Sequence, residues 1–204
     1  MKRADLKGYG ISVRKGNLFG KPDLSRVERE GRVLLVKDVG EKPFIFRWTL
    51  GLWLIQKEWK IYLRLAGIPG IPQPIERIDR FAFAVEWVDG KPIDRGEPLP
   101  ASFFENLERI LSDLHSRGVA HLDTRHKGNI LISERGEPYL IDFNSSFSFV
   151  EKGWLRRSFF PLLLWVDHGG FLKLKQRVSP ATMTPQEVTF LKRFNRWRKL
   201  WIFN

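Results

Sequence analysis

The chain of 204 residues contains no cysteine, which excludes disulfides and any metal site or nucleophile that depends on a thiolate. It also lacks a long apolar segment. Its longest apolar run, FFPLLLWV over residues 159–166, is far shorter than the roughly 20 residues needed to cross a bilayer. The first ten residues hold no apolar stretch of the kind found in a secretory signal. We therefore expect no transmembrane segment.

Acidic residues are scarce relative to basic ones. The chain carries 35 lysines and arginines against 23 aspartates and glutamates, which gives a formal net charge of +12. Residues 151–204 hold 11 basic and 3 acidic side chains and so contribute eight of these charges. Such an excess indicates an anionic partner, such as phosphate groups, nucleic acid or an acidic membrane surface, but it does not identify the fold.

Internal repeats, low-complexity tracts and long linkers are absent as well. A chain of this length can bury a sizeable core, either as one domain or as two small lobes. Residues 1–20 are basic and show no periodicity, and we expect them to be loosely structured. Residues 25–39 predict a β-hairpin about a turn at Glu30 and Gly31, because β-branched residues occupy both arms.

The remaining pattern mixes helices with strands. Residues 81–93 predict a strand followed by a turn, since aromatic residues and valine alternate before glycine and proline interrupt them. Ser102 and Glu105 have the spacing of a capping box, at the start of a helix that Gly118 ends. Two short strands, NILI and YLIDF, and a helical remainder follow. The chain therefore predicts an α+β fold.

A glutamate interrupts the apolar face of the helix predicted over residues 50–65. The apolar positions of that face recur at helical spacing: Leu50, Trp53, Leu54, Ile61 and Leu65. Glu58 lies on the same stripe, where burial of its carboxylate is costly unless a positive charge meets it. The alternative is that Glu58 sits at the edge of the stripe and reaches water.

The sequence HLDTRHKGNILI places acidic and amide side chains in a polar loop before a strand pair. Asp123 is placed to accept a proton from a hydroxyl nucleophile, while Asn129 and Asp142 offer oxygen ligands of the type that Mg²⁺ prefers. Thirteen positions separate Asn129 from Asp142, enough for a hairpin that returns both to one end. Arg125 and Lys127 add positive charge suited to a transferring phosphoryl group. Each of the three oxygen-bearing side chains also has an ordinary structural interpretation, as a turn cap, a loop brace or a strand end.

Taken together, these residues resemble the catalytic loop of the protein-kinase-like superfamily, which reads His-x-Asp, then Asn, before a strand that ends in Asp-Phe-Gly. The corresponding residues here are His121, Asp123, Asn129 and Asp142. The resemblance implies ATP as phosphoryl donor, Asp123 as catalytic base, and Asn129 with Asp142 as ligands of Mg²⁺. We assign His121 a structural role, in which its ring hydrogen-bonds nearby backbone and keeps the shape of the loop.

Upstream landmarks follow the order of the same superfamily. Lys37, in VLLVKD, matches the strand lysine that holds the nucleotide phosphates, and Glu58 matches its helix partner. VEWVDG resembles the hinge, where backbone groups of Glu86 and Val88 would contact adenine.

The resemblance spans residues 20–150 and implies a minimal bilobal protein-kinase-like fold. Residues 1–88 would form an N-lobe, with an antiparallel sheet, one helix and the nucleotide cover. Residues 89–204 would form a reduced, mostly helical C-lobe that carries the catalytic loop and a basic C-terminal helix.

Several features depart from the family pattern. The asparagine follows the catalytic aspartate by six positions rather than five, and Asn144 replaces the glycine of Asp-Phe-Gly. No G-x-G-x-x-G turn is present. The segment GKPDLSR, residues 20–26, is the candidate phosphate cover and is similar to the flexible loop of RIO kinases, which nominates Lys21 and Ser25 as nucleotide contacts. An activation segment ending in Ala-Pro-Glu is also missing, so a large peptide-docking platform is not expected.

Among kinase-like families, the small size and the D-x-R-x-x-x-N-I-L loop look most like the lipopolysaccharide core kinases of the Kdo kinase and WaaP group. This resemblance implies phosphorylation of a sugar hydroxyl of a lipopolysaccharide-type inner core, with Asp123 as base and Arg125 as charge stabiliser. Two alternatives stay open. One is a RIO-like serine/threonine protein kinase whose basic tail contacts nucleic acid or a ribonucleoprotein, and the other is a pseudokinase that binds without turnover. Retention of all five charged and amide landmarks favours an enzyme.

The C-terminal segment has its own pattern. Thr184, Pro185 and Glu187 mark a helix start. An aromatic stripe with basic neighbours follows, formed by Phe190, Phe194, Trp197 and Trp201. Packing of this stripe within the C-lobe is the favoured interpretation, whereas the charge excess favours an anionic membrane surface that bears a lipid-linked glycan. We expect a cytoplasmic chain, peripheral on the inner face of the inner membrane in the second case.

Overall fold

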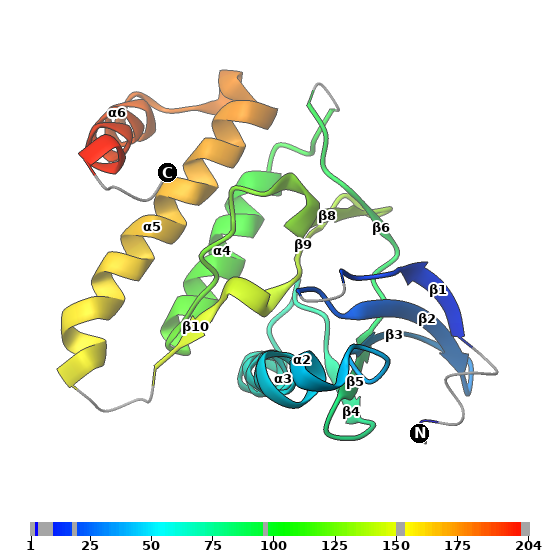
Figure 1. Cartoon of the computed structure of the whole chain (residues 1–204). Helices are drawn as coiled ribbons and strands as arrows, with labels where there is room; N and C mark the ends of the chain where they lie inside the picture. Colours follow the sequence, from blue (N-terminus) through cyan, green and yellow to red (C-terminus); the bar gives the residue numbers. More distant parts are fainter. Residues whose placement is uncertain (1–2, 4–9, 18–19, 96–97, 150–153, 201–204) are drawn as a thin grey trace. The chain divides into compact units, whose positions relative to one another are not determined.

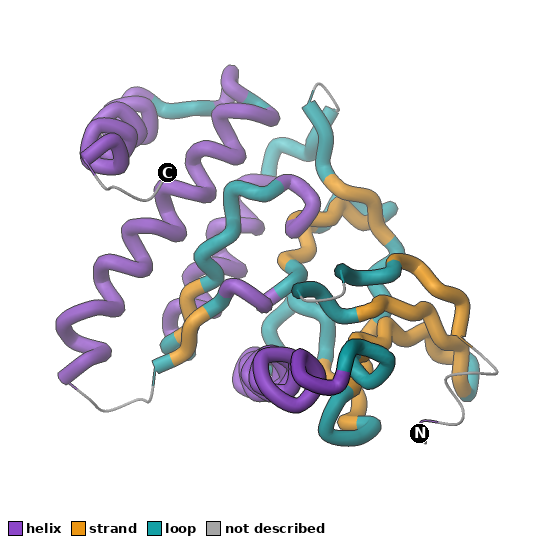
Figure 2. The backbone as a smooth tube through the Cα atoms, viewed as in Figure 1, coloured by secondary structure: helices purple, strands orange, loops and turns teal. Residues whose placement is uncertain are grey.

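The computed structural model of the chain describes residues 3, 10–17, 20–95, 98–149 and 154–200. The chain is mixed α and β and divides into two compact units, Met1–Asp89 and Gly90–Asn204. Figure 2 shows that a sheet dominates the first unit and that long helices dominate the second. The α+β class expected from the sequence is confirmed.

A five-stranded antiparallel sheet is the framework of the first unit, in the order β1-β2-β3-β5-β4 (Figure 1). Its strands are β1 (Gly10–Arg14), β2 (Asp23–Arg29), β3 (Arg32–Asp38), β4 (Pro74–Arg77) and β5 (Ala82–Glu86). The predicted hairpin is present as β2 and β3. Its turn residues Glu30 and Gly31 have φ angles of 52° and 72°, which suit the right-handed twist of paired strands. The expectation of loose structure is wrong for residues 10–14, because pairing with β2 orders them as an edge strand.

A long helical segment covers one face of this sheet and begins earlier than the sequence pattern predicts. It runs through α2 (Phe44–Phe46), the π-helical turn η1 (Arg47–Gly51) and α3 (Leu52–Leu65). Phe83 of β5 is fully buried, and its ring packs on those of Trp59 and Tyr62 of α3, with centroid distances of 5.5 and 5.8 Å. These aromatic contacts join α3 to the sheet.

The buried face of α3 differs from the predicted apolar stripe. Ile61 and Leu65 are buried as expected, whereas Leu50 and Trp53 are exposed. The side of α3 that carries Glu58 faces the sheet. A residue five positions away lies on a different side of a helix, and Trp53, five positions before Glu58, is accordingly exposed. Packing of α3 against the sheet, and not the spacing of apolar residues alone, therefore determines which face of α3 is buried.

The second unit holds two small antiparallel sheets and its own helices. Its strands are β6 (Gly90–Pro92), β7 (Val119–Ala120), β8 (Ile130–Ser133), β9 (Pro138–Leu140) and β10 (Phe147–Ser148), paired as β6-β8-β9 and β7-β10. Helix α4 (Phe103–Ser116) precedes β7. The capping box predicted at its start is wrong, because Ser102 has αR backbone angles and its side chain makes no capping hydrogen bond with the described residues. The N–H of Phe103 instead donates to the carbonyl oxygen of Pro100 at 2.9 Å.

Helices α5 (Trp154–Val178) and α6 (Pro185–Leu200) complete this unit. The start predicted for α6 is confirmed, because Glu187 N–H donates to Thr184 Oγ1 at 3.2 Å and Thr184 N–H donates to the Glu187 carboxylate at 2.7 Å. Phe194 is buried and packs on an indole ring of α5 at 4.5 Å between centroids. The stripe of α6 therefore packs within the unit, as favoured, except that Trp197 is exposed, while Trp201 lies outside the described residues.

Membrane-crossing segments were searched for among the helices that the structure describes. None of them combines the length and the apolar character that spanning a bilayer requires.

Candidate functional site

A buried ion pair joins β3 to α3 in the first unit. Lys37 is 4% exposed and Glu58 is 0% exposed, and Lys37 Nζ lies 2.5 Å from Glu58 Oε1. Lys37 shares a sheet face with its cross-strand neighbour Phe83, which packs on α3, so the strand points the ammonium toward the helix. The contact predicted between Lys37 and Glu58 is present, and the alternative in which Glu58 reaches water is wrong. A buried pair of this kind holds the lysine ammonium at one position on the strand.

In the second unit, the loop between β7 and β8 carries Asp123 and ties it to Asn129. Asn129 Nδ2 donates to Asp123 Oδ2 at 2.9 Å and to the carbonyl oxygen of Asp123 at 3.1 Å. These bonds turn Nδ2 toward Asp123 and the amide oxygen of Asn129 away from it. The Asp123 side chain is 33% exposed, so its carboxylate can be reached from solvent. The six-position spacing thus accommodates a direct contact between the two residues.

A buried aspartate on α5 holds the start of this loop. Asp167 is 0% exposed, and its carboxylate accepts hydrogen bonds from the N–H groups of His121 and Leu122, each at 2.6 Å. Its carboxylate also lies 2.9 Å from His115 Nε2, and its carbonyl oxygen accepts from Thr124 Oγ1 at 3.0 Å. Leu122 has a φ angle of +65°, which a leucine adopts only where its surroundings impose it.

The sequence pattern did not single out Asp167. The available signal was that Asp167 is the one acidic residue in the sequence of α5 and directly follows the long apolar run. A lone acid after such a run is expected to be buried against a donor, but its partner cannot be identified from spacing.

The ring of His121 links the loop to the segment that follows β9. Nε2 lies 3.2 Å from the carbonyl oxygen of Ile141, and Nδ1 lies 3.3 Å from the backbone nitrogen of Asp123. Because a carbonyl can only accept, Nε2 carries the proton and Nδ1 accepts from Asp123 N–H. Burial lowers the pKa of His121, against the opposing effect of Asp167 and other nearby carboxylates, so the ring is neutral. These two bonds confirm the structural role expected for His121.

The hairpin of β8 and β9 returns the chain to Asn129, as predicted. Ile141 N–H donates to the carbonyl oxygen of Asn129 at 2.9 Å, and Asp142 follows immediately. Asp142 has a φ angle of +67°, so two of the three non-glycine residues with positive φ in the described chain belong to this region, the other being Leu122. Such backbone strain costs about 1–3 kcal/mol per residue and is concentrated at functional sites.

The basic residues of the loop have different surroundings. Arg125 is exposed, and its Nε lies 4.0 Å from Asp123 Oδ1, at the limit of an ion pair. Lys127 instead pairs with Asp94 at 2.6 Å, and this hydrogen bond lowers the pKa of Asp94. Of the two nominated cations, Arg125 has its charge beside Asp123.

Glu86 and Val88, nominated as backbone contacts for adenine, lie at and after the end of β5. The N–H of Glu86 donates to the carbonyl oxygen of Gln73 at 2.9 Å, and the N–H of Gln73 donates to the Glu86 carboxylate at 3.3 Å. The backbone N–H of Glu86 is therefore already engaged. Val88 is half-buried in the segment that leads to β6.

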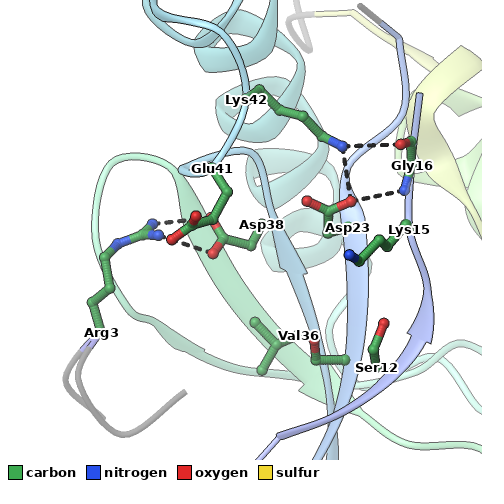
Figure 3. Close-up of a pocket in the computed structure, with 10 residues that line it drawn as sticks. Arg3, Ser12, Lys15, Gly16, Asp23, Val36, Asp38, Glu41 and Lys42 are labelled. Carbon is green, nitrogen blue, oxygen red and sulfur yellow. Dashed lines mark hydrogen bonds and ion pairs between the residues drawn. The ribbon is translucent and has the colours of Figure 1, made fainter. Parts of the chain in front are cut away.

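A cavity of about 570 Å³ is lined in part by residues of β1, β2 and β3 (Figure 3). Val36 and Asp38 line it, and they flank Lys37 in β3, so their side chains point to the other side of the sheet. Ser25 also lines the cavity because it is the register partner of Val36. The Ser25 side chain is therefore turned away from Lys37, which does not fit its nomination as a nucleotide contact beside that lysine. Lys21 lies exposed in the connection before β2.

Polar contacts anchor Asp23, which lies in the segment of residues 20–26 nominated as the phosphate cover. Lys42 Nζ donates to Asp23 Oδ1 at 2.8 Å and to the carbonyl oxygen of Gly16 at 3.1 Å, while Gly16 N–H donates to the same carboxylate oxygen at 2.8 Å (Figure 3). A side chain at Gly16 would collide with the backbone of Lys21 and Pro22. Asp23 therefore links Gly16 to Lys42 at the start of this segment.

The metal site that the resemblance implies was compared with the side chains present. No group of three or more histidine, cysteine, aspartate or glutamate side chains in the described part of the chain is arranged to hold a metal ion. A Mg²⁺ site does not need such a group, because Mg²⁺ takes few protein ligands and completes its coordination with water and phosphate oxygens. The amide oxygen of Asn129 and the carboxylate of Asp142 are two ligands of this kind. The hairpin brings these two residues to one end, and the amide oxygen of Asn129 is turned away from Asp123. The donor chemistry therefore fits Mg²⁺.

No protein-family model matches this chain, and no curated protein matches it either.

Proposed function

We propose that the chain is an ATP-dependent phosphotransferase with a minimal bilobal protein-kinase-like fold. The observation that carries the proposal is the contact between Asp123 and Asn129 at the end of the hairpin that leads to Asp142. One connected segment thereby holds a carboxylate base and two oxygen ligands. The buried pair of Lys37 and Glu58 is a separate observation that supports the proposal, because it lies in the first unit whereas Asp123 and Asn129 lie in the second. The first unit would serve as the N-lobe and the second as the reduced C-lobe.

Each unit carries residues that the resemblance assigns to nucleotide binding. Lys37 would contact phosphate oxygens of ATP while Glu58 holds its ammonium in place. The carbonyl oxygen of Glu86 and the backbone of Val88 would contact adenine. Asn129 and Asp142 would hold Mg²⁺, which when bound neutralises charge on the terminal phosphates.

Asp123 would act as the base toward an acceptor hydroxyl. As the hydroxyl oxygen bonds to the γ-phosphorus, the bond from that phosphorus to the bridging oxygen of ADP breaks, and the hydroxyl proton passes to Asp123. Asn129 Nδ2 donates to one carboxylate oxygen at 2.9 Å, which leaves the other, Oδ1, to receive this proton. Arg125 Nε lies 4.0 Å from Oδ1 and would stabilise negative charge on the transferring group.

The acceptor that we propose is a sugar hydroxyl of a lipopolysaccharide-type inner core, in a lipid-linked glycan at the inner face of the inner membrane. The support is chemical. The chain has a net charge of +12, and Lys192, Arg193 and Arg196 are exposed on α6, where they suit a phosphorylated glycan.

Transfer of labelled γ-phosphate from Mg-ATP tests this function. Dephosphorylated core lipopolysaccharide and a generic basic protein are offered to wild type, Asp123→Ala and Asp113→Ala. Asp113 is the matched control because it is an exposed aspartate on α4 outside the loop. We expect wild type and Asp113→Ala to label the glycan, and Asp123→Ala to lose at least about 100-fold in rate, as loss of a general base requires.

Binding of ATP separates the roles further. Asp123→Ala should bind ATP as wild type does, whereas Lys37→Ala should bind it more weakly. Label in the basic protein would identify a RIO-like protein kinase. ATP binding without label in either acceptor would favour a pseudokinase, and equal activity of Asp123→Ala and wild type would remove Asp123 as the base.

A further inference from the structure

The start of the long helical segment in the first unit carries a concentration of exposed apolar side chains. Five large apolar residues of α2, η1 and the first turn of α3 are between 39 and 76% exposed: Phe44, Ile45, Trp48, Leu50 and Trp53. Burial of such side chains stabilises a fold, and the chain forgoes this stabilisation at five positions in one short stretch. Contiguous exposed apolar side chains are typical of interaction sites. We call these five residues the aromatic surface.

Cationic side chains lie over the indole rings of the aromatic surface. The guanidinium of Arg80 is 5.2 Å from the ring centroid of Trp48, and Lys57 Nζ is 4.9 Å from that of Trp53. The sequence between Lys42 and Lys57 contains no acidic residue. The aromatic surface is therefore both apolar and positively charged, which is the composition of segments that lie at a membrane interface.

The π-helical turn η1 contributes to this arrangement. A π-helical turn is wider than an α-helical one, so residues five positions apart, such as Trp48 and Trp53, lie closer to the same side of the helix than they would in a regular α-helix. π turns within α-helices occur frequently at functional sites. Figure 1 shows α2 leading directly into α3, so the aromatic surface is presented by one continuous helical segment.

We propose that the aromatic surface docks on the headgroup region of an anionic phospholipid bilayer. Indole and phenyl rings are favoured at that interface, and lysine and arginine beside them reach lipid phosphates and are attracted to an acidic membrane surface. A protein partner would have to supply an apolar pocket and acidic groups in one matching pattern, whereas a lipid interface supplies both over any area. The net charge of +12 favours the same partner. This binding does not rest on phosphoryl transfer, and it assigns the membrane contact to the first unit rather than to α6.

Sedimentation with vesicles tests the proposal. The full chain is mixed, at low salt and without ATP, with vesicles of phosphatidylcholine alone or with an equal part of phosphatidylglycerol. We expect wild type to sediment with the phosphatidylglycerol vesicles and to be released in about 1 M NaCl, where the Debye length falls to about 3 Å. The double variant Ile45→Ser with Trp53→Gln should bind at least about tenfold more weakly, since each lost side chain removes apolar contact with the interface.

Trp197→Gln is the matched control, because Trp197 is 61% exposed on α6 and Trp53 is 57% exposed. It should bind as wild type does. Circular dichroism establishes that the variants fold, and Arg80→Glu, which reverses one charge and keeps every ring, should also weaken binding. Quenching of tryptophan fluorescence by brominated phosphatidylglycerol should be reduced by Trp53→Gln and unchanged by Trp197→Gln.

Three outcomes would overturn the proposal. If wild type does not bind phosphatidylglycerol vesicles at low salt, the aromatic surface is not a membrane-docking site. Loss of binding in Trp197→Gln, with binding retained in the double variant, would place the contact on α6. Self-association of wild type that disappears in the double variant, without vesicle binding, would assign the aromatic surface to a protein contact. None of these outcomes depends on whether the chain transfers phosphate.

Discussion

Replacing Asp167 by alanine removes the acceptor of two backbone N–H groups at the start of the loop that carries Asp123. The carboxylate is fully buried and accepts from the N–H groups of His121 and Leu122, each at 2.6 Å, and it lies 2.9 Å from His115 Nε2. Alanine keeps α5 helical because its helix propensity is high, so the change acts on the hydrogen bonds rather than on the helix.

The expected cost follows from these contacts. A buried N–H left without its acceptor costs about 1–3 kcal/mol, so two of them cost about 2–6 kcal/mol. Part of this is returned because alanine carries no charge that must be desolvated, and we expect a net loss of roughly 2–4 kcal/mol in the free energy of unfolding. The left-handed backbone of Leu122 would lose its restraint at the same time, and that strain amounts to about 1–3 kcal/mol.

Urea denaturation and native-state hydrogen exchange measure both effects on the full chain. Asp167→Asn should lie between wild type and Asp167→Ala, because the remaining amide oxygen can still accept from at least one N–H. Asp113→Ala, an exposed aspartate on α4, is the control for loss of a carboxylate. Asp167 does not anchor the loop if Asp167→Ala matches this control within about 0.5 kcal/mol, the range of ordinary surface changes, and the amides of His121 and Leu122 exchange as in wild type.

Three further changes test other parts of the molecule. In a double-mutant cycle of Lys37→Met and Glu58→Met, each single change should lower the free energy of unfolding by about 3–5 kcal/mol, because the remaining charge loses its buried partner. The double change should cost less than the sum of the two single changes. Additive values in urea denaturation would contradict a coupled pair. Burial holds the pKa of His121 below its ordinary 6.5, so the unfolded chain takes up the proton first as the pH falls. Stability should therefore be full above about pH 6.5 and decline below it by up to about 1.4 kcal/mol per pH unit, a slope that His121→Gln should flatten and the exposed His126→Gln should not. Gly169→Ala would set a methyl group against a ring of α6 and should cost about 1–3 kcal/mol despite the helix propensity of alanine; a melting temperature at or above that of wild type would show that α6 moves aside without cost.

Elements whose partners lie a few positions apart could be predicted from the sequence. The turn at Glu30 and Gly31 and the reciprocal capping bonds of Thr184 and Glu187 depend on local geometry, and both are present. The capping box expected at Ser102 has the same spacing and does not form, because the backbone there is already helical. A local pattern thus predicts a cap only where the preceding chain enters with extended backbone.

Contacts between distant segments could not be predicted in this way. Asp167 bonds to a backbone N–H 46 positions earlier, and no spacing rule connects the two. The exposure of Trp53 is a second case, because its place on the helix depends on which side α3 turns to the sheet. Both depend on the packing of whole elements rather than on the residues themselves.

For the candidate site, the sequence alone identified the candidate residues in their order along the chain: Lys37, Glu58, Asp123, Asn129 and Asp142. It also predicted the hairpin that returns Asp142 to Asn129, because thirteen positions suffice for two short strands and a turn. Only the tertiary structure decided that Lys37 and Glu58 are buried together and that Asn129 holds the carboxylate of Asp123. The reason is that successive side chains of a strand point to opposite faces, so a shift of one position exchanges the buried and the exposed sets, and packing of the complete sheet against its helix determines which set is buried.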